Sequence, residues 1–329
     1  MSTKAPIAVI TGANGFVGSH LSELLLSKGW KVRSIIRSSS NTKWLDHQDV
    51  ELHPVGITDI ALVAQVLQGA DYLFHLAGTT KSINEQGFYD GNVETTRVVL
   101  EAALQAQLTN IVVSSSLAAS APAQNRTPVT EETASNPFSM YGQSKVAQEA
   151  LCKEYMDRLP ITIVRPPIIF GPRDTEVFLF FKMVNTGFVT AVGSQEKYLS
   201  AVFINDLVRG LMQAASSEAA IGETFFITSE EFYSWSQFAD EIARALNKKT
   251  RTIRIPQALL KPIAAISEGI DRLRGRPATL SREKAREMAQ EAWICSAAKA
   301  TKLFGYRQEW QLKDSVKQTV DWYRKEGWL

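Results

Sequence analysis

The sequence predicts an α/β protein with a doubly wound parallel sheet and a smaller, partly interleaved C-terminal domain. Short apolar segments of strand length alternate with segments of helical periodicity through residues 1–172. A glycine-rich turn joins the first strand to the first helix. After Pro172 the sequence becomes mainly helical, which we assign to a second domain, residues 173–329, with segments that return to the sheet.

Continuous apolar runs indicate the strands, because helices cover both faces of a parallel sheet. They are IAVIT (7–11), KVRSIIR (31–37), DYLFHLAG (71–78), NIVVSSS (110–116) and ITIVRPP (161–167). Helical spacing occupies 19–29, 59–69, 92–107 and 144–158, and right-handed crossovers then follow. Beyond Pro172, SAVFI (200–204) and TFFIT (224–228) are strand-like. We expect lids or mobile segments at 79–91 and 272–286.

Composition excludes several classes of protein. The 329 residues are 45% hydrophobic and 21% charged with a net charge of +2, so no nucleic-acid partner is predicted. Cys152 and Cys295, with four scattered histidines, predict buried thiols rather than a metal site or disulfide. We find no signal-peptide pattern, and 256–275, the nearest candidate for a span, is amphipathic and charged. We expect a cytoplasmic protein without stable membrane insertion.

The segment TGANGFVGSHL follows a strand and opens a helix, the context in which a glycine pattern is informative. Glycines spaced G-x-x-G-x-x-G permit a tight turn and close approach of a pyrophosphate, which the amides at the helix N-terminus then face. A merely tight turn is the alternative. We therefore predict a Rossmann dinucleotide site that includes Gly12, Asn14, Gly15, Phe16, Val17 and Gly18.

The end of the second strand, SIIRSSSN, bears on the choice of dinucleotide. A carboxylate there binds the ribose of NAD, whereas an arginine suits the 2′-phosphate of NADP. Arg37 is followed by three serines, and a guanidinium with hydroxyls is suited to phosphate. A solvated arginine is the alternative interpretation. NADP is the preferred cofactor, with NAD as the second choice.

The stretch YGQSK places Tyr141 and Lys145 one helical turn apart on the same face. A free phenol with a pKa near 10 is a poor proton donor or acceptor at neutral pH. An ammonium beside it favours the phenolate and lowers the pKa of the phenol. The pair is thus a candidate general acid, although this spacing also occurs by chance on solvated helices.

These motifs together resemble the extended short-chain dehydrogenase/reductase superfamily, the NAD-dependent epimerase/dehydratase family, over nearly the whole chain. Its marks here are TGANGFVG, FHLAG (74–78), NVETT (92–96), VVSSS (112–116), YGQSK, RPPIIFGP (165–172) and FINDL (203–207). The resemblance implies that Ser116 hydrogen-bonds the substrate oxygen, Tyr141 exchanges the proton, and Lys145 binds the nicotinamide ribose and lowers the tyrosine pKa. It also implies an architectural role for Asn92. Further cofactor contacts implied by it are Ile57, Leu76, Ala77, Gly78, Pro166 and Ile168.

Departures from the family pattern narrow the range of reactions that we expect. Gly56 stands where a carboxylate near the adenine is common, with Asp59 three residues on. Dehydratases have Thr-Asp-Glu where this chain has Ser116-Leu117-Ala118, so elimination of water is not expected. Epimerases often carry an arginine before the FINDL-like strand, and YLSAVFIND has none. The pattern is closest to bacterial ketone reductases similar to 3β-hydroxysteroid dehydrogenase and dihydroflavonol reductase.

A bulky, mostly apolar substrate is expected, because apolar residues surround the predicted catalytic groups. They are Leu117, Phe138, Met140, Ile168, Ile169 and Phe170, with Phe178, Phe180 and Phe181 across the cleft. The segment EVFLFFKMV (176–184) is either such a wall or an ordinary core helix. Lys81, Arg173 and Lys182 leave room for one anionic handle on the substrate.

We therefore predict an NAD(P)-dependent oxidoreductase that reduces a ketone, or oxidises the alcohol, on a small molecule. Tyr141 gives its proton to the developing alkoxide while Ser116 donates to the same oxygen. A nucleotide-sugar epimerase with retained NAD is the first alternative, and a non-catalytic dinucleotide-sensing scaffold is a minor one. The resemblance also implies a homodimer formed through helices 92–107 and 144–158.

Overall fold

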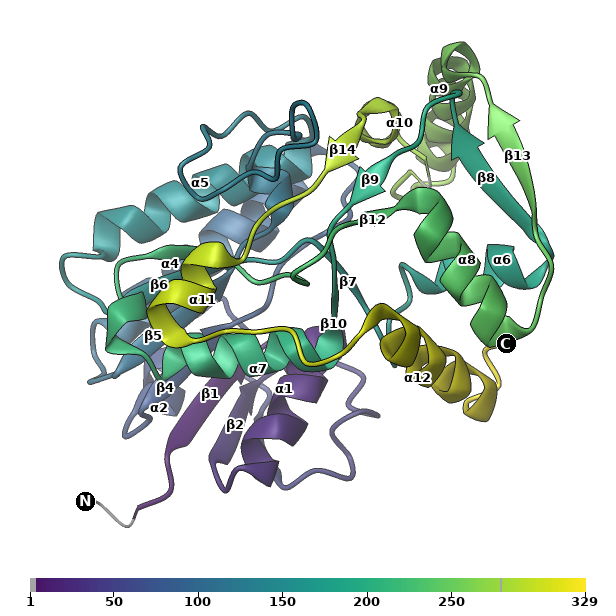
Figure 1. Cartoon of the computed structure of the whole chain (residues 1–329). Helices are drawn as coiled ribbons and strands as arrows, with labels where there is room; N and C mark the ends of the chain where they lie inside the picture. The colour runs from purple at the N-terminus through teal and green to yellow at the C-terminus, as the bar shows by residue number, and fades with distance from the viewer. Residues whose placement is uncertain (1–3, 279) are drawn as a thin grey trace.

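The computed structural model describes residues 4–278 and 280–329. Its centre is a seven-stranded, all-parallel sheet in the order β11-β6-β5-β4-β1-β2-β3, with helices on both faces (Figure 1). This confirms the predicted doubly wound α/β fold. The domain division at residue 172 stays a prediction, since one core cluster holds buried residues from both sides of it, among them Val164 and Phe181.

The bounds of the elements follow the chain. The strands are β1 (Ile7–Thr11), β2 (Lys31–Ile35), β3 (Val50–His53), β4 (Tyr72–His75), β5 (Asn110–Ser114), β6 (Ile161–Arg165), β7 (Ile168–Phe170), β8 (Phe188–Val192), β9 (Tyr198–Leu199), β10 (Ala201–Phe203), β11 (Thr224–Phe226), β12 (Tyr233–Ser234), β13 (Arg251–Ile255) and β14 (Ala292–Trp293). The α-helices are α1 (Phe16–Ser27), α2 (Ile60–Leu67), α3 (Glu85–Tyr89), α4 (Thr95–Ala103), α5 (Met140–Tyr155), α6 (Phe178–Asn185), α7 (Ile204–Ala215), α8 (Trp235–Leu246), α9 (Gln257–Leu273), α10 (Arg282–Ala289), α11 (Ala298–Phe304) and α12 (Leu312–Lys325). A π-helix covers Asp90–Glu94, and 3₁₀ turns cover Leu117–Ala119 and Glu218–Ala220.

Alternation along the strands produces two cores, one on each face of the sheet. In β1, Ala8 and Ile10 belong to the core that includes α1 and α7, whereas Ile7 and Val9 belong to the core of α2, α4 and α5. Successive side chains of a strand point to opposite faces, so a strand covered on both sides must be apolar throughout. That requirement explains why β1 is buried at every position.

The order of strands reverses between β1 and β4. β1 pairs with β2 on one side and with β4 on the other, and Thr11 and His75 are partners at the carboxyl ends of the two strands. Crossovers leave in opposite directions from such a point, which opens a crevice where ligands of α/β proteins bind. This carboxyl edge of the sheet carries both the glycine-rich turn and the region of Ser116 and Lys145.

The predicted helices have different bounds in the structure, and the first and third of them bear on the site. The first begins at Phe16, inside the glycine motif, rather than at residue 19. The helix predicted for 92–107 starts earlier, with α3 and the π-helix, and its α-helical part α4 ends at Ala103. The π-turn holds Asn92, whose side chain bonds to the backbone of Thr79, a contact that spacing does not predict. The lid expectation for 79–91 and 272–286 stays a prediction, and Thr279 lies outside the described residues.

The phenylalanines of α6 pack in the C-terminal core. Phe181 is fully buried and meets the ring of Tyr323, while Phe178 lies edge-on to Tyr323 and Trp328. Phe180 packs on Trp235 and Phe238 of α8. The expectation that Phe178, Phe180 and Phe181 line a substrate cleft is therefore wrong, and the core-helix interpretation of 176–184 holds. Aromatic pairs of this kind stabilise by about 0.5–1.5 kcal/mol beyond the burial of their area.

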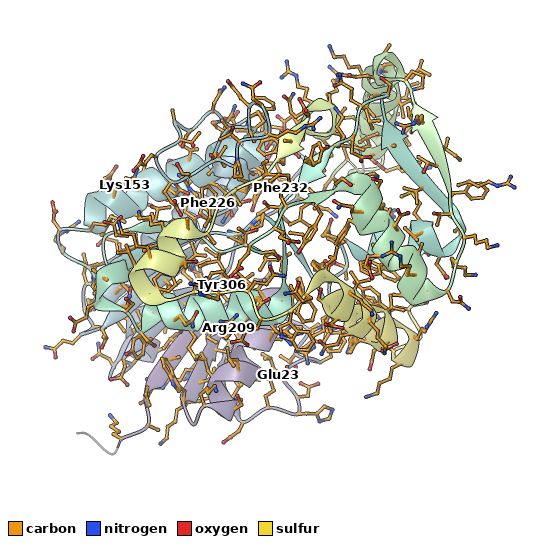
Figure 2. All side chains as sticks on the ribbon, viewed as in Figure 1. Glu23, Lys153, Arg209, Phe226, Phe232 and Tyr306 are labelled. Carbon is orange, nitrogen blue, oxygen red and sulfur yellow. The ribbon has the colours of Figure 1, made fainter. Side chains whose placement is uncertain are left out.

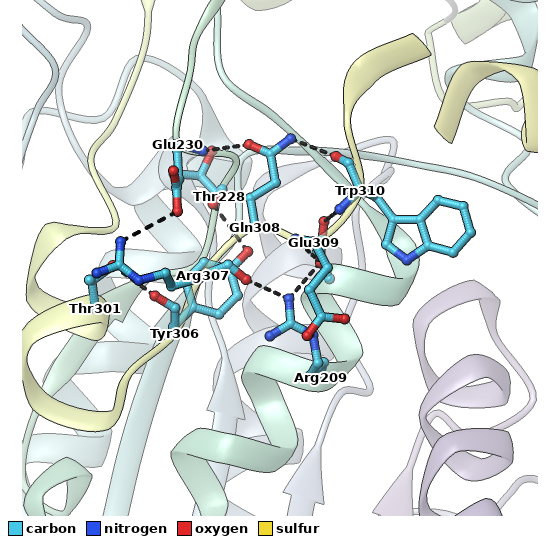
Figure 3. A network of polar contacts seen from close by, with 10 residues as sticks. Arg209, Thr228, Glu230, Thr301, Tyr306, Arg307, Gln308, Glu309 and Trp310 are labelled. Carbon is cyan, nitrogen blue, oxygen red and sulfur yellow. Dashed lines mark hydrogen bonds and ion pairs between the residues drawn. The ribbon is translucent and has the colours of Figure 1, made fainter. Parts of the chain in front are cut away.

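A polar network joins the C-terminal segment to α7 and the sheet (Figure 3). The hydroxyl of Tyr306 donates to the carbonyl of Thr228 at 3.1 Å, and the hydroxyl of Thr301 donates to the carbonyl of Tyr306 at 2.8 Å. Tyr306 and Phe226 are fully buried among the side chains that fill the space beside the sheet (Figure 2). The segment after α11 is therefore fixed by specific acceptors.

Asp206 anchors the same network from the first turn of α7. Only 1% of its surface is exposed, and its carboxylate accepts from the amides of Glu309 (3.0 Å) and Trp310 (3.1 Å). Its remaining partner is the guanidinium of Arg209 at 2.6 Å. Arg209 also pairs at 3.3 Å with Glu309, whose side chain is 63% exposed. One arginine thus has a buried and a solvated partner.

We predict that Asp206→Ala lowers the free energy of unfolding by about 3–5 kcal/mol, because it leaves two amides without their acceptor and removes the buried partner of the Arg209 guanidinium. Glu309→Ala is the matched control and costs less than about 1 kcal/mol, since its ion pair with Arg209 is solvated. Urea denaturation of both variants measures the difference. Equal losses would contradict the anchoring role of Asp206.

Candidate functional site

The glycine-rich turn fits a pyrophosphate. Gly12 has a φ of +74°, and a Cβ there would lie 2.9 Å from the amide nitrogen of Ala77. A Cβ on Gly18 would lie 2.3 Å from the carbonyl oxygen of Gly12, so both positions require glycine. Gly15 caps α1 without a side-chain hydrogen bond to the amides of the first turn. These amides can therefore bind an anion at the positive end of the helix dipole.

The other predicted cofactor residues lie near this turn or further along the same edge. The amides of Leu76 and Ala77 donate to the carbonyl and hydroxyl oxygens of Thr11, both at 3.2 Å, which places Gly78 next along the chain. The side-chain amide of Asn14 donates to the carbonyl of Asn41 at 3.3 Å. Phe16 and Val17 are the first two residues of α1.

The remaining cofactor candidates are more dispersed. Ile57 packs half-buried against the core on the α2 side, and Pro166 is buried and accepts from the amide of Leu117 at 2.9 Å. Ile168 is 38% exposed in β7. Arg37 is exposed just after β2, where its amide donates to the hydroxyl of Ser40 at 3.1 Å. Its guanidinium makes no hydrogen bond or ion pair within 4–278 and 280–329, so it is free to meet a phosphate.

Ser116 and Tyr141 are brought together by the packing of α5 on the 3₁₀ turn 117–119. Ser116 caps that turn, and its hydroxyl accepts from the amide of Ala118 at 3.1 Å. Tyr141 is the second residue of α5, next to Gly142. A Cβ on Gly142 would lie 2.4 Å from the carbonyl oxygen of Ala118, so only glycine allows this approach. We did not single out Gly142 from the sequence, although its place inside YGQSK was the available signal.

Burial raises the pKa of Tyr141, whereas its hydrogen bond with Ser116 lowers this pKa and the charge of Glu287 raises it. The ring of Phe88 lies 6.2 Å from the tyrosine ring between centroids. An apolar environment disfavours the phenolate, so the phenol is held protonated, as a proton donor must be. Lys145 is not among the groups that shift the pKa of Tyr141, for the reason given next, and the expectation that it lowers this pKa stays a prediction.

The ammonium of Lys145 is directed at the sheet rather than at the phenol. Its Nζ donates to the carbonyl of Ser114 and to the side-chain oxygen of Gln148, each at 2.9 Å, and lies 6.0 Å from the centroid of the Tyr141 ring. Burial lowers the pKa of Lys145 to about 8, and the carboxylate of Glu149 opposes that shift. A Cβ on Gly78 would lie 2.7 Å from the side-chain oxygen of Asn92, so glycine there leaves room for this buried amide beside Lys145.

Asn92 holds the loop before α3 against the catalytic helix. Its side-chain oxygen accepts from the amide of Thr79 at 2.8 Å, and its nitrogen donates to the carbonyl of Thr79 at 3.0 Å and to the hydroxyl of Ser144 at 2.9 Å. The residue is fully buried and lies in the π-turn. π-turns inside helices occur frequently at functional sites. The contacts agree with the architectural role that the family resemblance implied.

A buried polar network, which the sequence did not reveal, connects the glycine-rich turn to Lys145. The ring of His75 bonds to the hydroxyls of Thr11 (2.8 Å) and Thr96 (2.9 Å), and Gln148 donates to Thr96 at 2.8 Å. Thr96 uses its own proton on the carbonyl of Asn92 at 2.6 Å, so it must accept from His75 Nε2. Burial lowers the pKa of His75 to about 3, which keeps the ring neutral.

A second buried group lies beside this network. Arg165 binds both carboxylate oxygens of Glu149, at 2.7 and 2.5 Å, and the hydroxyl of Ser115 donates to the same carboxylate. The two charged side chains are 6% and 5% exposed. A bidentate pair with a third donor is the arrangement in which buried charges are tolerated. It places a negative charge one turn from Lys145 on α5.

Other predicted residues have structural partners. Lys81 forms an ion pair with Glu176 at 2.5 Å, and Arg173 binds Glu23 and the hydroxyl of Ser19. Cys152 and Cys295 are buried free thiols, and burial raises the pKa of each to about 12. Within the described ranges, no group of three or more His, Cys, Asp or Glu side chains is placed to hold a metal ion.

Comparison with known proteins identifies the family. The model of the NAD dependent epimerase/dehydratase family matches residues 8–227, and the chain belongs to this family. It is thus related to NAD-dependent dehydrogenases and epimerases with a Rossmann-like fold.

Individual relatives have different activities. Ceramide reductase of Caulobacter vibrioides is 29% identical over 330 residues, 100% of this chain and 98% of the relative. Mouse sterol-4-alpha-carboxylate 3-dehydrogenase, decarboxylating, is 26% identical over 97% of this chain and 91% of its own. N-acetyl-alpha-D-glucosaminyl-diphospho-ditrans,octacis-undecaprenol 4-epimerase of Escherichia coli O157:H7 is 28% identical over 76% of each.

Solved structures show the same architecture. The crystal structure of gox2253 superposes with a TM-score of 0.82 at 26% identity and covers 98% of both chains. UDP-glucuronic acid 4-epimerase from Bacillus cereus has a TM-score of 0.77 at 21% identity, covering 97% of this chain and 99% of its own. The second likeness concerns the fold alone.

We predict that Gln148 sets the protonation of Lys145. Gln148→Leu removes an acceptor from the ammonium and moves the titration midpoint below about 8, whereas Gln148→Glu adds a carboxylate and moves it upward. The measurement is the pH dependence of the Lys145 Cε signal in ¹³C-lysine NMR, assigned by its loss in Lys145→Arg. A midpoint that neither variant moves would remove Gln148 from this role.

Proposed function

We propose that the chain is an NAD(P)-dependent oxidoreductase that reduces a ketone, or oxidises the corresponding alcohol, on a bulky and mostly apolar molecule. The main support is the half-buried Ser116–Tyr141 pair, joined by a hydrogen bond, beside the buried Lys145 at the carboxyl edge of the sheet. The relatives of known name that span nearly the whole chain include a reductase of ceramide and a dehydrogenase of sterols, both apolar compounds.

Each residue of the site has a distinct task in this proposal. Tyr141, held protonated by burial, gives its proton to the oxygen of the carbonyl as negative charge develops there. Ser116 donates a second hydrogen bond to the same oxygen, which stabilises the alkoxide. Lys145, whose ammonium is held by the carbonyl of Ser114 and by Gln148, binds the ribose next to the nicotinamide. The bound dinucleotide supplies the hydride, and alcohol oxidation uses the same groups in reverse.

The dinucleotide is held, in this proposal, by the glycine-rich turn and the amides that open α1. Gly12 allows the turn to pack on the backbone of Ala77 after β4, and Gly18 allows α1 to pack on the carbonyl of Gly12. The unpartnered guanidinium of Arg37 supports NADP as the preferred cofactor, with NAD as the alternative. The family itself is NAD-dependent.

The surroundings of Tyr141 support an apolar substrate. Phe88 contacts its ring, and Phe138, three residues earlier, packs edge-on against Trp293 with centroids 5.9 Å apart. Of the three candidates for an anionic handle, Lys81 and Arg173 are engaged with carboxylates, and Lys182 is exposed in the last turn of α6. A site with apolar walls and few free cations would leave a diphosphate poorly paired.

The substrate test is a turnover panel in which loss of NADPH is followed by absorbance. It contains a keto-ceramide, a long-chain β-keto acyl compound and a 3-keto steroid, together with UDP-, GDP- and dTDP-sugars. We expect an apolar ketone to react. Tyr141→Phe is the matched control, because it removes only the hydroxyl, and its turnover falls roughly 10²–10⁴-fold while dinucleotide binding survives. A Phe variant with near-normal turnover would exclude Tyr141 as the acid.

A nucleotide-sugar epimerase with retained NAD is the second candidate. The relative from Escherichia coli named as a 4-epimerase of a diphospho-undecaprenol sugar favours it. Such an enzyme shows no net loss of NADPH and retains NAD through purification. Turnover of a sugar nucleotide in the panel, with every apolar ketone inert, would promote this candidate over the reductase.

We predict that Arg37→Ala weakens binding of NADPH about 10- to 100-fold and leaves NADH nearly unchanged, because only the 2′-phosphate pair is lost. Lys31→Ala is the control, since it removes a positive charge at the opposite end of β2. Fluorescence titration of both nucleotides measures the ratio. If NADPH and NADH lose affinity equally, or if the unmodified chain prefers NADH, then Arg37 does not select the cofactor.

The same proposal includes a homodimer formed through α4 and α5 and a cytoplasmic location. These two helices pack on one another and cover the same face of the sheet, together with α2 (Figure 1). Tyr155 of α5 donates to Glu101 of α4, so the two helices already form one continuous surface.

A further inference from the structure

The helix α9 exposes a continuous apolar stripe. Its members follow the spacing i, i+4, i+7, i+11, i+14, which is one face of a helix. They are Leu259 (51% exposed), Ile263 (44%), Ile266 (65%), Ile270 (44%) and Leu273 (91%). Isolated apolar side chains on a surface need no explanation, but five on one helical face form a patch of the kind that marks an interaction site.

The stripe is not the face by which α9 packs on the protein. Leu260 and Ala264 are buried against Val192 and against Ala285 of α10. They are therefore the buried face of α9. The exposed stripe is a second apolar face, rotated around the axis from the first. Folding of this chain alone therefore does not account for it.

The strand pair β8–β13, which reaches α9 through Val192, adds two exposed apolar side chains. Phe188 (46% exposed) and Ile253 (49%) lie on β8 and β13, whose register pairs Phe188 with Arg251 and Ile253 with Thr190. Side chains of Phe188 and Val192 share one face of this ribbon, because they are four residues apart. Val192 packs on α9, so Phe188 and Ile253 lie on the same face of the ribbon as this contact, with Phe188 at the opposite end of β8.

Positive charge is concentrated in the same region. Residues 248–286 contain eleven Lys or Arg and three Asp or Glu, a net charge of +8. The whole chain has a net charge of +2, so the remainder carries −6. Arg254, Lys261, Arg274 and Arg276 are exposed at the two ends and on the polar side of α9. A surface that is apolar at its centre and basic around it complements the interface of an anionic lipid membrane.

The patch is also connected to the catalytic helix α5 through α10. α10 packs on α9, and Glu283 of α10 accepts from the amide of Met140, the residue before Tyr141, at 3.1 Å. Figure 1 shows the α9–α10 pair at the end of the molecule beyond β9 and β14. Two contacts, α9 with α10 and Glu283 with Met140, thus connect a ligand bound at α9 to the start of α5.

We propose that α9, with Phe188 and Ile253, docks on the surface of a membrane that contains anionic lipid. The helix lies in the interface, with its stripe among the acyl chains and the surrounding arginines and lysines at the headgroups. No helix in the described part of the chain is long and apolar enough to cross a bilayer, so the attachment is peripheral. Such attachment would bring Tyr141 near apolar molecules that reside in the bilayer.

The test is co-sedimentation of the full chain with vesicles, without dinucleotide or substrate. Vesicles of phosphatidylcholine mixed with phosphatidylglycerol should bind the protein, and vesicles of phosphatidylcholine alone, or raised salt, should weaken binding. Ile266→Gln with Leu273→Gln changes the two most exposed members of the stripe and should reduce affinity at least ~10-fold. Arg274→Gln with Arg276→Gln should reduce it roughly 10-fold on anionic vesicles only. Leu179→Gln, 58% exposed on α6, is the control and should have no effect.

Several outcomes would overturn the proposal. Absence of binding to anionic vesicles is one, and equal binding by the unmodified chain and the Ile266→Gln/Leu273→Gln variant is another. Light scattering that shows self-association through the stripe, lost in this variant, would assign the patch to a second copy of the chain. Circular dichroism verifies that each variant is folded. Because the assay needs no turnover, its failure would leave the proposed reaction intact.

Discussion

The charge of Lys145, taken out of water, is the constraint that orders the site around it. A buried ammonium persists only where acceptors compensate its lost hydration. The acceptors come from the last carbonyl of β5 and from Gln148 on α5, with the carboxylate of Glu149 nearby. The side-chain amide of Gln148 in turn donates to the hydroxyl of Thr96. The same hydroxyl accepts a hydrogen bond from the neutral ring of His75. Strands β4 and β5 and helices α4 and α5 are thereby held in a single relative position.

Close approach of backbone is the second requirement, and three glycines supply it. Gly12 meets the turn after β4, Gly78 leaves space for Asn92 and Lys145, and Gly142 seats α5 against Ala118. A side chain at Gly12 or Gly142 would push two backbone segments apart, and one at Gly78 would displace the buried amide of Asn92. The polar network and the glycines therefore act together, because hydrogen bonds near 2.9 Å form only if the backbones come this close.

Much of the fold was predictable because its information is local. The apolar run of β1 and the helical spacing around Leu21 and Leu25 identify strand and helix without knowledge of their neighbours. Tyr141 and Lys145 could be paired because they are one turn apart. The acceptors of Lys145, by contrast, depend on which elements pack together. No residue next to Gln148 or His75 in the sequence indicates the hydrogen bonds that these side chains form. The aromatic packing of Phe178 on Tyr323 joins residues far apart in the chain, so spacing alone did not distinguish core from cleft.

The return of β11 to the sheet has a consequence for synthesis of the chain. β6 is complete at Arg165, but its partner on the outer side, β11, begins only at Thr224. While the intervening residues are being translated, β6 is the outermost strand of the nascent sheet, with unpaired backbone groups and the buried-type sequence ITIVR. Such an edge is a template for intermolecular pairing. The ribosome-bound chain is therefore most exposed to aggregation before residue 226 emerges, and chaperone protection would matter most in that interval.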